Sequence, residues 1–240
     1  MVCSRVAPRG ARLTGPRTRQ AVAAYGIILL LSGLALTVVV RTNELLWGEI
    51  PVTRALSAAL VRPVELALIP IDVLLTDVSA IVIYVLLCGV VFWRLGLVPL
   101  AILGLAGLLT VPTRLVDLAA RPRPTPNIEW AQTIFGEGGY PSGHVVYSVL
   151  IFGTFAILLQ RYEPPSQFRR IAVAILWTLT VLMGPIRIAQ LEHWPADVAA
   201  GYLFGFAFLA AIVLLIPLLD KLCESDMRPR RWKAPLADPP

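Results

Sequence analysis

Gly138-Gly139-Tyr140-Pro141-Ser142-Gly143-His144 is the stretch around which the rest of this chain is organised. Two glycines and a proline stand directly before a long apolar run, so the stretch predicts a turn that leads into the start of a helix. At such a start, the first backbone N–H groups and the positive end of the helix dipole point toward one place, which favours an anion. Ser142 and His144 lie beside it, and His144 is one of two histidines in 240 residues.

The composition around this turn is that of a membrane protein. Hydrophobic residues make up 57% of the chain and charged residues 15%, whereas a soluble domain carries about a quarter charged residues. The net charge of +6 does not indicate a nucleic-acid partner, because the basic residues gather in tails and loops beside apolar runs. The three cysteines have no spacing typical of a metal site or a disulfide.

Six apolar runs predict an all-α bundle of about six transmembrane helices. The first, Ala21 to Val40, is long enough to cross the roughly 30 Å hydrocarbon core. A signal peptide is the alternative, but the run exceeds a typical signal-peptide core and has no small-residue cleavage site. The other spans are expected at Val78–Trp93, Leu97–Pro112, Val145–Leu159, Ile171–Gly184 and Asp197–Leu219. The span Leu97–Pro112 is expected to continue as a helix toward Arg121. Residues 21–220 thus form the membrane domain, between basic tails 1–20 and 221–240 that are predicted to be disordered.

Residues 41–76 mix charged residues with leucine and alanine, and three prolines divide them into pieces too short to cross a membrane. Two interpretations stay open for this extracytoplasmic segment. It can form interfacial helices that lie on the bilayer, or a packed loop with no role toward lipid.

The distribution of basic residues predicts the orientation. Six spans place both termini on one side, and fourteen of the 21 lysines and arginines lie on that side. The positive-inside rule therefore predicts that both tails are cytoplasmic. The turn at 138–144 and two further polar segments, 114–123 and 187–197, are then expected to meet at the extracytoplasmic face.

The first of these polar segments holds Arg114 and Arg121. Their spacing of seven residues puts them on one face of a helix, and Asp117 lies near that face. Alone, two arginines at a membrane surface are typical snorkelling anchors.

The second polar segment holds the other histidine. His193 and Asp197 are four residues apart, and Pro195 between them predicts a helix that begins near Trp194. Asp197 can then accept the Nδ1–H of His193 and leave a lone pair on Nε2. Alone, such a pair is more typical of a structural hydrogen bond than of a catalytic pair. Arg187 precedes His193 by six residues.

Together, these groups favour phosphoryl transfer. Arginines and N–H donors bind a phosphoryl group, a neutral imidazole can attack phosphorus, and a protonated imidazole can protonate the leaving oxygen. This chemistry requires no metal and no other cofactor, and ionisable groups of this kind in a membrane protein are usually functional.

Three motifs resemble the signature of the type-2 phosphatidic acid phosphatase superfamily, which includes lipid phosphate phosphatases, bacterial acid phosphatases and vanadium haloperoxidases. They are Arg114-x6-Arg121-Pro122, Pro141-Ser142-Gly143-His144 and Arg187-x5-His193-x3-Asp197. The resemblance implies that His193 is the nucleophile, Asp197 its orienting partner, and His144 the general acid that later activates water. It also implies that the phosphate is held by Arg114, Arg121, Arg187, Ser142 and the N–H of Gly143.

The chain departs from the family pattern at two positions. Arg114 stands where the family usually has lysine, and its planar fork changes the geometry of the contact. Ile186 replaces a usual serine, which removes one hydroxyl worth about 1 kcal/mol. Arg123 is an alternative to Arg121 as the ligand, although that register puts Val116 at the lysine position.

The resulting hypothesis is a multi-pass plasma-membrane lipid phosphatase that works through a phosphohistidine at the outer face. Its expected substrates are polyprenyl diphosphates such as undecaprenyl diphosphate, phosphatidylglycerol phosphate, or phosphatidic acid. The alternatives are a phosphotransferase that uses an alcohol acceptor and an inactive lipid-binding scaffold; a vanadium haloperoxidase fits the membrane plan less well. Glu192, beside His193, is interpreted as a rim charge, and Glu129, Trp130, Glu137 and Tyr140 as loop residues that are solvated or contact the head group.

Overall fold

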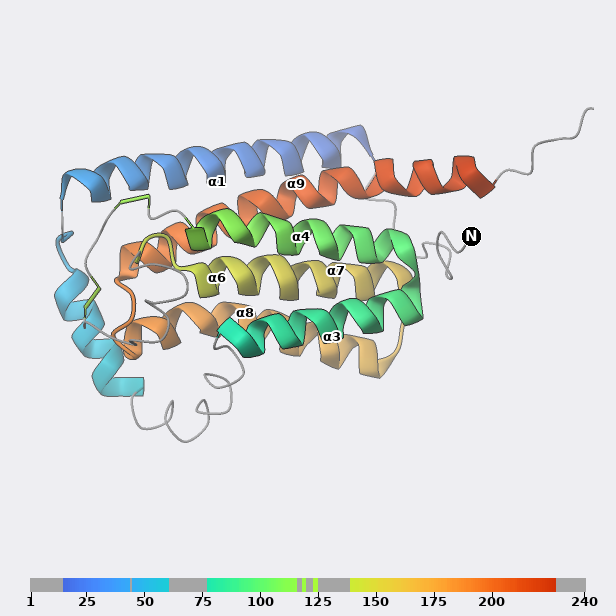
Figure 1. Cartoon of the computed structure of the whole chain (residues 1–240). Helices are drawn as coiled ribbons and strands as arrows, with labels where there is room; N and C mark the ends of the chain where they lie inside the picture. The colour runs from blue at the N-terminus through green and yellow to red at the C-terminus, as the bar shows by residue number, and fades with distance from the viewer. Residues whose placement is uncertain are drawn as a thin grey trace, which may run out of the picture.

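A computed structural model describes residues 15–43, 45–60, 77–115, 118–119, 123–124 and 139–227. The regular secondary structure in these ranges is all helical, with no strand, which confirms the expected all-α bundle (Figure 1). The long elements are α1 (Pro16–Thr42), α3 (Asp77–Leu95), α4 (Leu97–Leu115), the continuous run Gly143–Tyr162, α8 (Gln167–Ala189) and α9 (Pro195–Met227).

These elements match the six expected spans. Five are long and apolar enough to cross a membrane, and Leu97–Pro112 within α4 is a shorter apolar helix. They alternate in direction, so that α1 begins at the end of the bundle where α9 finishes (Figure 1). The side of the membrane on which that end lies stays a prediction.

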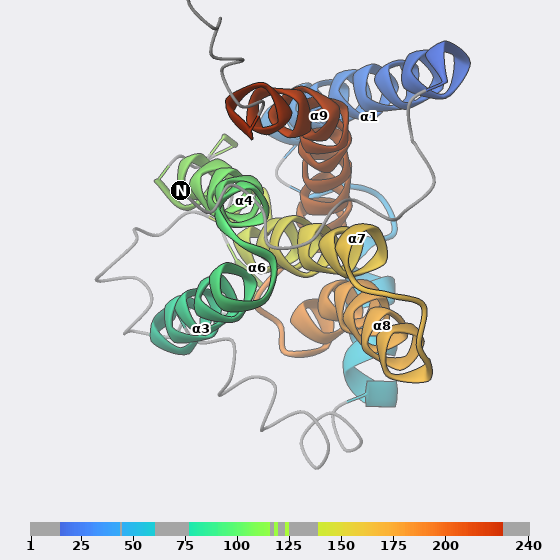
Figure 2. The same cartoon turned by 90° about the vertical axis from the view of Figure 1, so that its right-hand side faces the viewer.

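The run Gly143–Tyr162 is the central helix of the bundle. It comprises α6 (Gly143–Tyr147), a π-helical turn η1 (Ser148–Phe152) and α7 (Gly153–Tyr162). Its sequence is apolar on every side, as is typical of a helix buried all round. Two thirds of its apolar stretch is buried (67%), against 11% for the apolar stretch of α1. α4, α8 and α9 all contact this helix (Figure 2).

Two glycines set the distance between α9 and the central helix. A Cβ atom on Gly201 would lie 2.9 Å from Cβ of Val145, and one on Gly205 would lie 2.9 Å from Cβ of Val149. No real side chain tolerates such contacts, so the close approach requires glycine at both positions. The start of α9 is thereby brought against the start of α6, and the backbone N–H of Ser142 donates to the carbonyl of Asp197 (3.0 Å).

α1 lies along α9 at the side of the bundle (Figures 1 and 2). Its outward side chains are large, apolar and exposed, as at Ile28 and Leu31. An apolar surface of this extent indicates contact with lipid. On the inner side, the hydroxyl groups of Thr37 and Tyr140 are 3.1 Å apart, so the turn before the central helix is bonded to α1.

The third span does not continue as a helix to Arg121. α4 ends at Leu115, and residues 118–119 form a bend in which the N–H of Leu118 donates to the carbonyl of Tyr140 (3.1 Å). The N–H that a helix would have used is thus taken by the turn at 139–141. The expected continuation of this helix to Arg121 is therefore wrong, and Arg121 itself lies outside the described residues.

Both outer helices extend into the expected tails. α1 begins at Pro16, because proline is suited to the first helical position. α9 continues to Met227, since no proline or glycine interrupts the sequence between Lys221 and that residue.

Part of the 41–76 segment is also helical. Residues 49–60 form a helix that lies across one end of the bundle, drawn in cyan in Figure 1. The remaining residues of that segment, from 61 to 76, lie outside the described ranges.

Candidate active site

Three chain segments meet at one end of the bundle: the end of α8, the start of α9 and the start of α6 (Figure 1, left). Arg187 lies near the end of α8, His193 lies two residues before α9, and His144 lies in the first turn of α6. The alternating direction of the spans brings these segments together, as the sequence predicts.

A tight turn after α8 positions His193. Leu191 has a φ of 60°, which is uncommon for a residue with a side chain. The N–H groups of Glu192 and His193 both donate to the carbonyl of Arg187, at 3.1 and 3.3 Å. The chain therefore folds back on the last turn of α8, and both side chains return toward Arg187.

The imidazole of His193 is buried and held in one tautomer. Its Nδ1 lies 2.9 Å from the carbonyl oxygen of Gly139. A carbonyl only accepts hydrogen bonds, so Nδ1 carries the proton and Nε2 keeps its lone pair. A neutral imidazole with a free Nε2 is the form required of a nucleophile.

Asp197 lies close to His193 but beyond hydrogen-bond distance of it. Its Oδ2 is 3.8 Å from Nδ1 of His193, whereas it accepts a 2.8 Å hydrogen bond from the N–H of Trp194. Asp197 therefore caps the start of α9, where a carboxylate also complements the helix dipole. The expected direct bond from His193 to Asp197 is replaced by the bond to Gly139.

Arg187 connects the two sides of the site. Its Nη2 lies 2.6 Å from Nε2 of His144. A guanidinium only donates, so Nε2 of His144 accepts and carries no proton in this arrangement. Nη1 lies 3.0 Å from Oε2 of Glu192 and donates to Oε1 of Gln190 at 2.9 Å.

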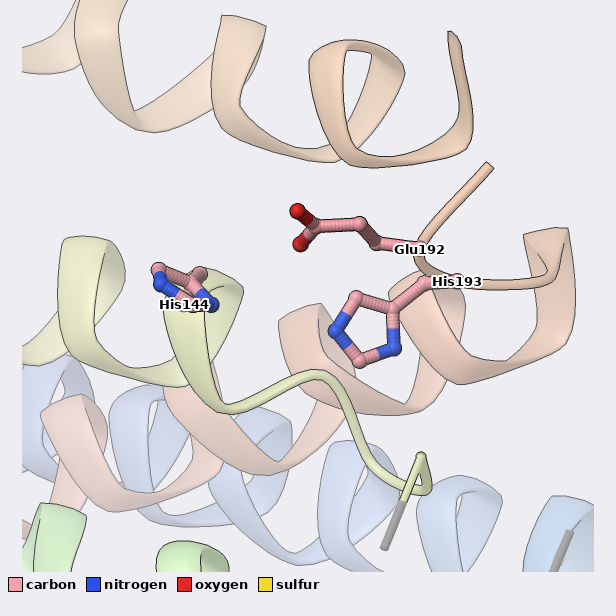
Figure 3. A group of neighbouring side chains, drawn as sticks. All are labelled: His144, Glu192 and His193. Atoms are coloured by element: carbon pink, nitrogen blue, oxygen red, sulfur yellow. The ribbon is translucent and has the colours of Figure 1, made fainter. Parts of the chain in front are cut away.

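Glu192 is not a rim charge. Its side chain is buried and directed into the space between the two histidines (Figure 3). The ligand atoms of His144, Glu192 and His193 all lie within 4.8 Å of one another. Two imidazoles and a carboxylate at such distances resemble a zinc ligand set. The guanidinium of Arg187 is bonded to two of the three, however, and its fixed positive charge favours an anion.

Ser142 adds a donor to the same site. The residue is fully buried, its Oγ does not cap the helix, and no hydrogen-bond partner for it occurs among the described residues. Buried hydroxyl groups are normally hydrogen-bonded. Together with the N–H of Gly143, which opens a 20-residue helical run, this hydroxyl is suited to hold an anion.

The structure leaves the first motif incomplete. Arg114 lies in the last turn of α4, but its side chain is outside the description. Arg123 is half-buried between two undescribed stretches. The phosphate contacts of Arg114, Arg121 and Arg123 therefore stay predictions.

Sequence reasoning missed several contributors to the site, namely the carbonyl of Gly139, the amide of Gln190 and the carboxylates of Glu192 and Glu49. Glu49 is buried at the start of the helix 49–60 and accepts hydrogen bonds from the N–H groups of Ala196 (3.1 Å) and Leu46 (2.7 Å). The helix from the 41–76 segment is thus fixed to the start of α9. The one available signal was the position of Glu192, an acid adjacent to a histidine and near an arginine.

The fold and the site together define a multi-pass helical membrane protein whose histidines and arginine meet at one end of the bundle. The sequence model of the PAP2 superfamily matches residues 95–220. The chain belongs to this superfamily, and the match contains all three motifs.

Among solved structures, the chain is similar to the crystal structure of the first transmembrane PAP2 type phosphatidylglycerolphosphate phosphatase from Bacillus subtilis. The TM-score is 0.59 and the sequence identity 21%, and the alignment covers 85% of this chain and 98% of that chain. At this identity the similarity shows the fold. No curated protein sequence matches the chain.

Proposed function

We propose that this protein is an integral-membrane lipid phosphatase that hydrolyses a lipid phosphate or diphosphate through a phosphohistidine. The observation that carries the proposal is the pair of imidazoles around Arg187. Nε2 of His193 has its lone pair free because Gly139 holds Nδ1, and Nε2 of His144 is bonded to Arg187.

In the first half-reaction, Nε2 of His193 attacks the phosphorus and the bond from phosphorus to the lipid oxygen breaks. Arg187, Ser142 and the N–H of Gly143 hold the phosphoryl oxygens as charge develops on them. The guanidinium then binds the phosphate instead of His144, and Nε2 of His144 takes a proton from solvent. His144 gives that proton to the departing lipid oxygen.

In the second half-reaction, water attacks the phosphohistidine. His144 accepts a proton from the water, the phosphorus–nitrogen bond breaks, and His193 returns to its neutral form. Inorganic phosphate is released. No step requires a metal ion, so turnover should persist in EDTA.

Two observations support a lipid substrate. The site lies at the end of a bundle whose outer surface is apolar over the length of several spans, so a substrate anchored in the membrane can reach it. The similar protein from Bacillus subtilis is described as a phosphatidylglycerolphosphate phosphatase. Phosphatidylglycerol phosphate, phosphatidic acid and polyprenyl diphosphate are the substrates to compare, at the extracytoplasmic face of the plasma membrane.

The deciding experiment measures phosphate release by purified protein in detergent from each of these lipids, with and without EDTA. We expect release from at least one lipid, unchanged by EDTA. His193→Ala should reduce the rate about 10⁵-fold or more, since it removes the covalent nucleophile. Near-normal activity of a folded His193→Ala protein would refute the mechanism.

The same assay separates hydrolysis from transfer. If the phosphoryl group passes to an alcohol acceptor, a new phosphomonoester of that alcohol accumulates and no inorganic phosphate appears. A protein that binds the lipids but forms neither product would be a scaffold.

A further inference from the structure

We propose that the carboxylate of Glu192 pairs with Arg187 in the empty site and thereby weakens the binding of inorganic phosphate to Arg187. The inference rests on the proposed function, because it concerns the release of that reaction's product. It assigns a role to a carboxylate that the reaction steps do not use. Glu192 would thus determine how strongly the site discriminates between the lipid substrate and free phosphate.

The first observation is that Glu192 takes a place suited to a phosphate oxygen. Its Oε2 lies 3.0 Å from Nη1 of Arg187, and both side chains are almost fully buried. Carboxylate and phosphate oxygens bind guanidinium groups in the same way. A phosphate that reaches Arg187 must therefore compete with Glu192 for the guanidinium.

The second observation is that the backbone fixes Glu192 at this place. Its N–H donates to the carbonyl of Arg187, and the preceding residue, Leu191, has a left-handed conformation that turns the chain back. Glu192 and Arg187 are therefore joined through the main chain as well as through their side chains. When phosphate takes the guanidinium, the carboxylate stays nearby.

The third observation concerns charge. The carboxylate of Glu192 faces the same space as the reactive nitrogens of His144 and His193 (Figure 3). A phosphate bound between these histidines has a negative charge next to it, and repulsion in a buried site is only weakly screened. Free phosphate can offset this repulsion only through the contacts to its own oxygens, whereas a lipid substrate also binds through its tail.

The expected consequence is weak product inhibition. An enzyme whose product is a small anion turns over faster if that anion leaves readily, because product release often limits the rate. Glu192 would supply this property without touching the reacting phosphorus. Its removal should tighten phosphate binding and slow turnover at saturating substrate.

The test compares wild-type protein with Glu192→Gln. Glutamine keeps the size and the acceptor oxygen for Arg187 but removes the charge. We expect inorganic phosphate to bind about tenfold more tightly to the variant, as measured by calorimetry in detergent and as a lower inhibition constant in the release assay. KM for the lipid should fall, and so should kcat.

A merely structural role predicts the opposite sign. If Glu192 only holds Arg187 in place, its loss frees the guanidinium to move, and phosphate binds more weakly. Gln190→Ala is the matched control, because it removes the neutral acceptor from the same Nη1 atom. This variant should not tighten phosphate binding.

The remaining outcomes are also decisive. Unchanged or weaker phosphate binding by Glu192→Gln, in a protein that hydrolyses lipid phosphate, overturns this inference alone. Glu192→Ala repeats the sign test if the glutamine variant does not fold. Failure of both variants to fold would make the ion pair a structural requirement and would also overturn it. Wild-type protein that neither releases nor binds phosphate would overturn the proposed function as well.

Discussion

Two arginine–glutamate pairs lie at opposite ends of this bundle and have nearly the same length. Arg94 and Glu163 are 3.1 Å apart, with 53% and 21% of their side chains exposed. Arg187 and Glu192 are 3.0 Å apart, with 4% and 10% exposed. Distance alone would make them equivalent, and burial makes them different.

The difference teaches what each pair does. An exposed pair contributes about 0–1 kcal/mol, because water screens the charges and the side chains lose freedom. A buried pair gains little overall, yet removing one partner costs about 3–5 kcal/mol because the other charge is left without compensation. Loss of either partner of the Arg187–Glu192 pair should therefore lower stability more than loss of a partner at the exposed end. A ligand that binds Arg187 in place of Glu192 also leaves the carboxylate without its cation.

Arg187→Ala is expected to reduce activity and stability far more than the matching substitution Arg94→Ala at the other end. In the proposed mechanism it removes an arginine that stabilises the transferring phosphoryl group, a contribution of about 10³–10⁵ in rate. It also leaves Glu192 buried without its cation, which should lower the free energy of unfolding by about 3–5 kcal/mol. Rates of phosphate release and melting temperatures in detergent measure both effects. The control is Arg94→Ala, and equal losses in the two variants would contradict the comparison.

His144→Ala is expected to reduce the rate by about 10²–10⁴ with little change in stability. The residue is half-buried, and Arg187 keeps its bonds to Glu192 and Gln190 in the variant. A role as general acid also predicts that an aryl phosphate, whose leaving oxygen needs no proton, loses less activity than a lipid phosphate. Equal losses for both substrates would argue that His144 only positions Arg187.

Glu49→Gln tests a buried carboxylate at the site end that is bonded to two backbone N–H groups. Each of its oxygens accepts from a backbone N–H, so an amide must turn a donor toward one of them. We expect a loss of about 1–3 kcal/mol in stability, and a moderate fall in activity because the start of α9 loosens. Melting temperature and kcat are the measurements, and an unchanged melting temperature would show that this contact is dispensable.

Glu163→Gln is expected to have the smallest effect and is the matched control for both glutamine variants. The same substitution at the exposed end should change the free energy of unfolding by less than about 1 kcal/mol and leave kcat and phosphate inhibition unaltered. A loss of activity here would show that the far end of the bundle is coupled to the site.

Much of this architecture could be predicted from the sequence because it follows from composition and from the spacing of apolar runs along the chain. Apolar runs define the spans, and their alternation brings His144, Arg187 and His193 to one end. The glycine and proline turn before His144 likewise defines the start of the central helix. These features depend on residues close together in the chain.

The parts that could not be predicted depend on contacts between distant residues. α4 stops short because the N–H of Leu118 bonds to Tyr140, and His193 is oriented by the carbonyl of Gly139. Glu192 points inward because Leu191 has a positive φ, which nothing in its side chain indicates. A carbonyl group carries no sequence signal, and neither does the direction of a turn.

The close contact of α9 with the central helix at Gly201 and Gly205 also affects the geometry of the site. A backbone hydrogen bond joins Ser142 to Asp197, so the width of the proposed phosphate site depends on how closely α9 lies against the central helix. That separation is set by two missing side chains rather than by any group that touches the substrate. These two glycines thus determine the spacing of the site, and a single methyl group at Gly201 would widen the site without touching the substrate.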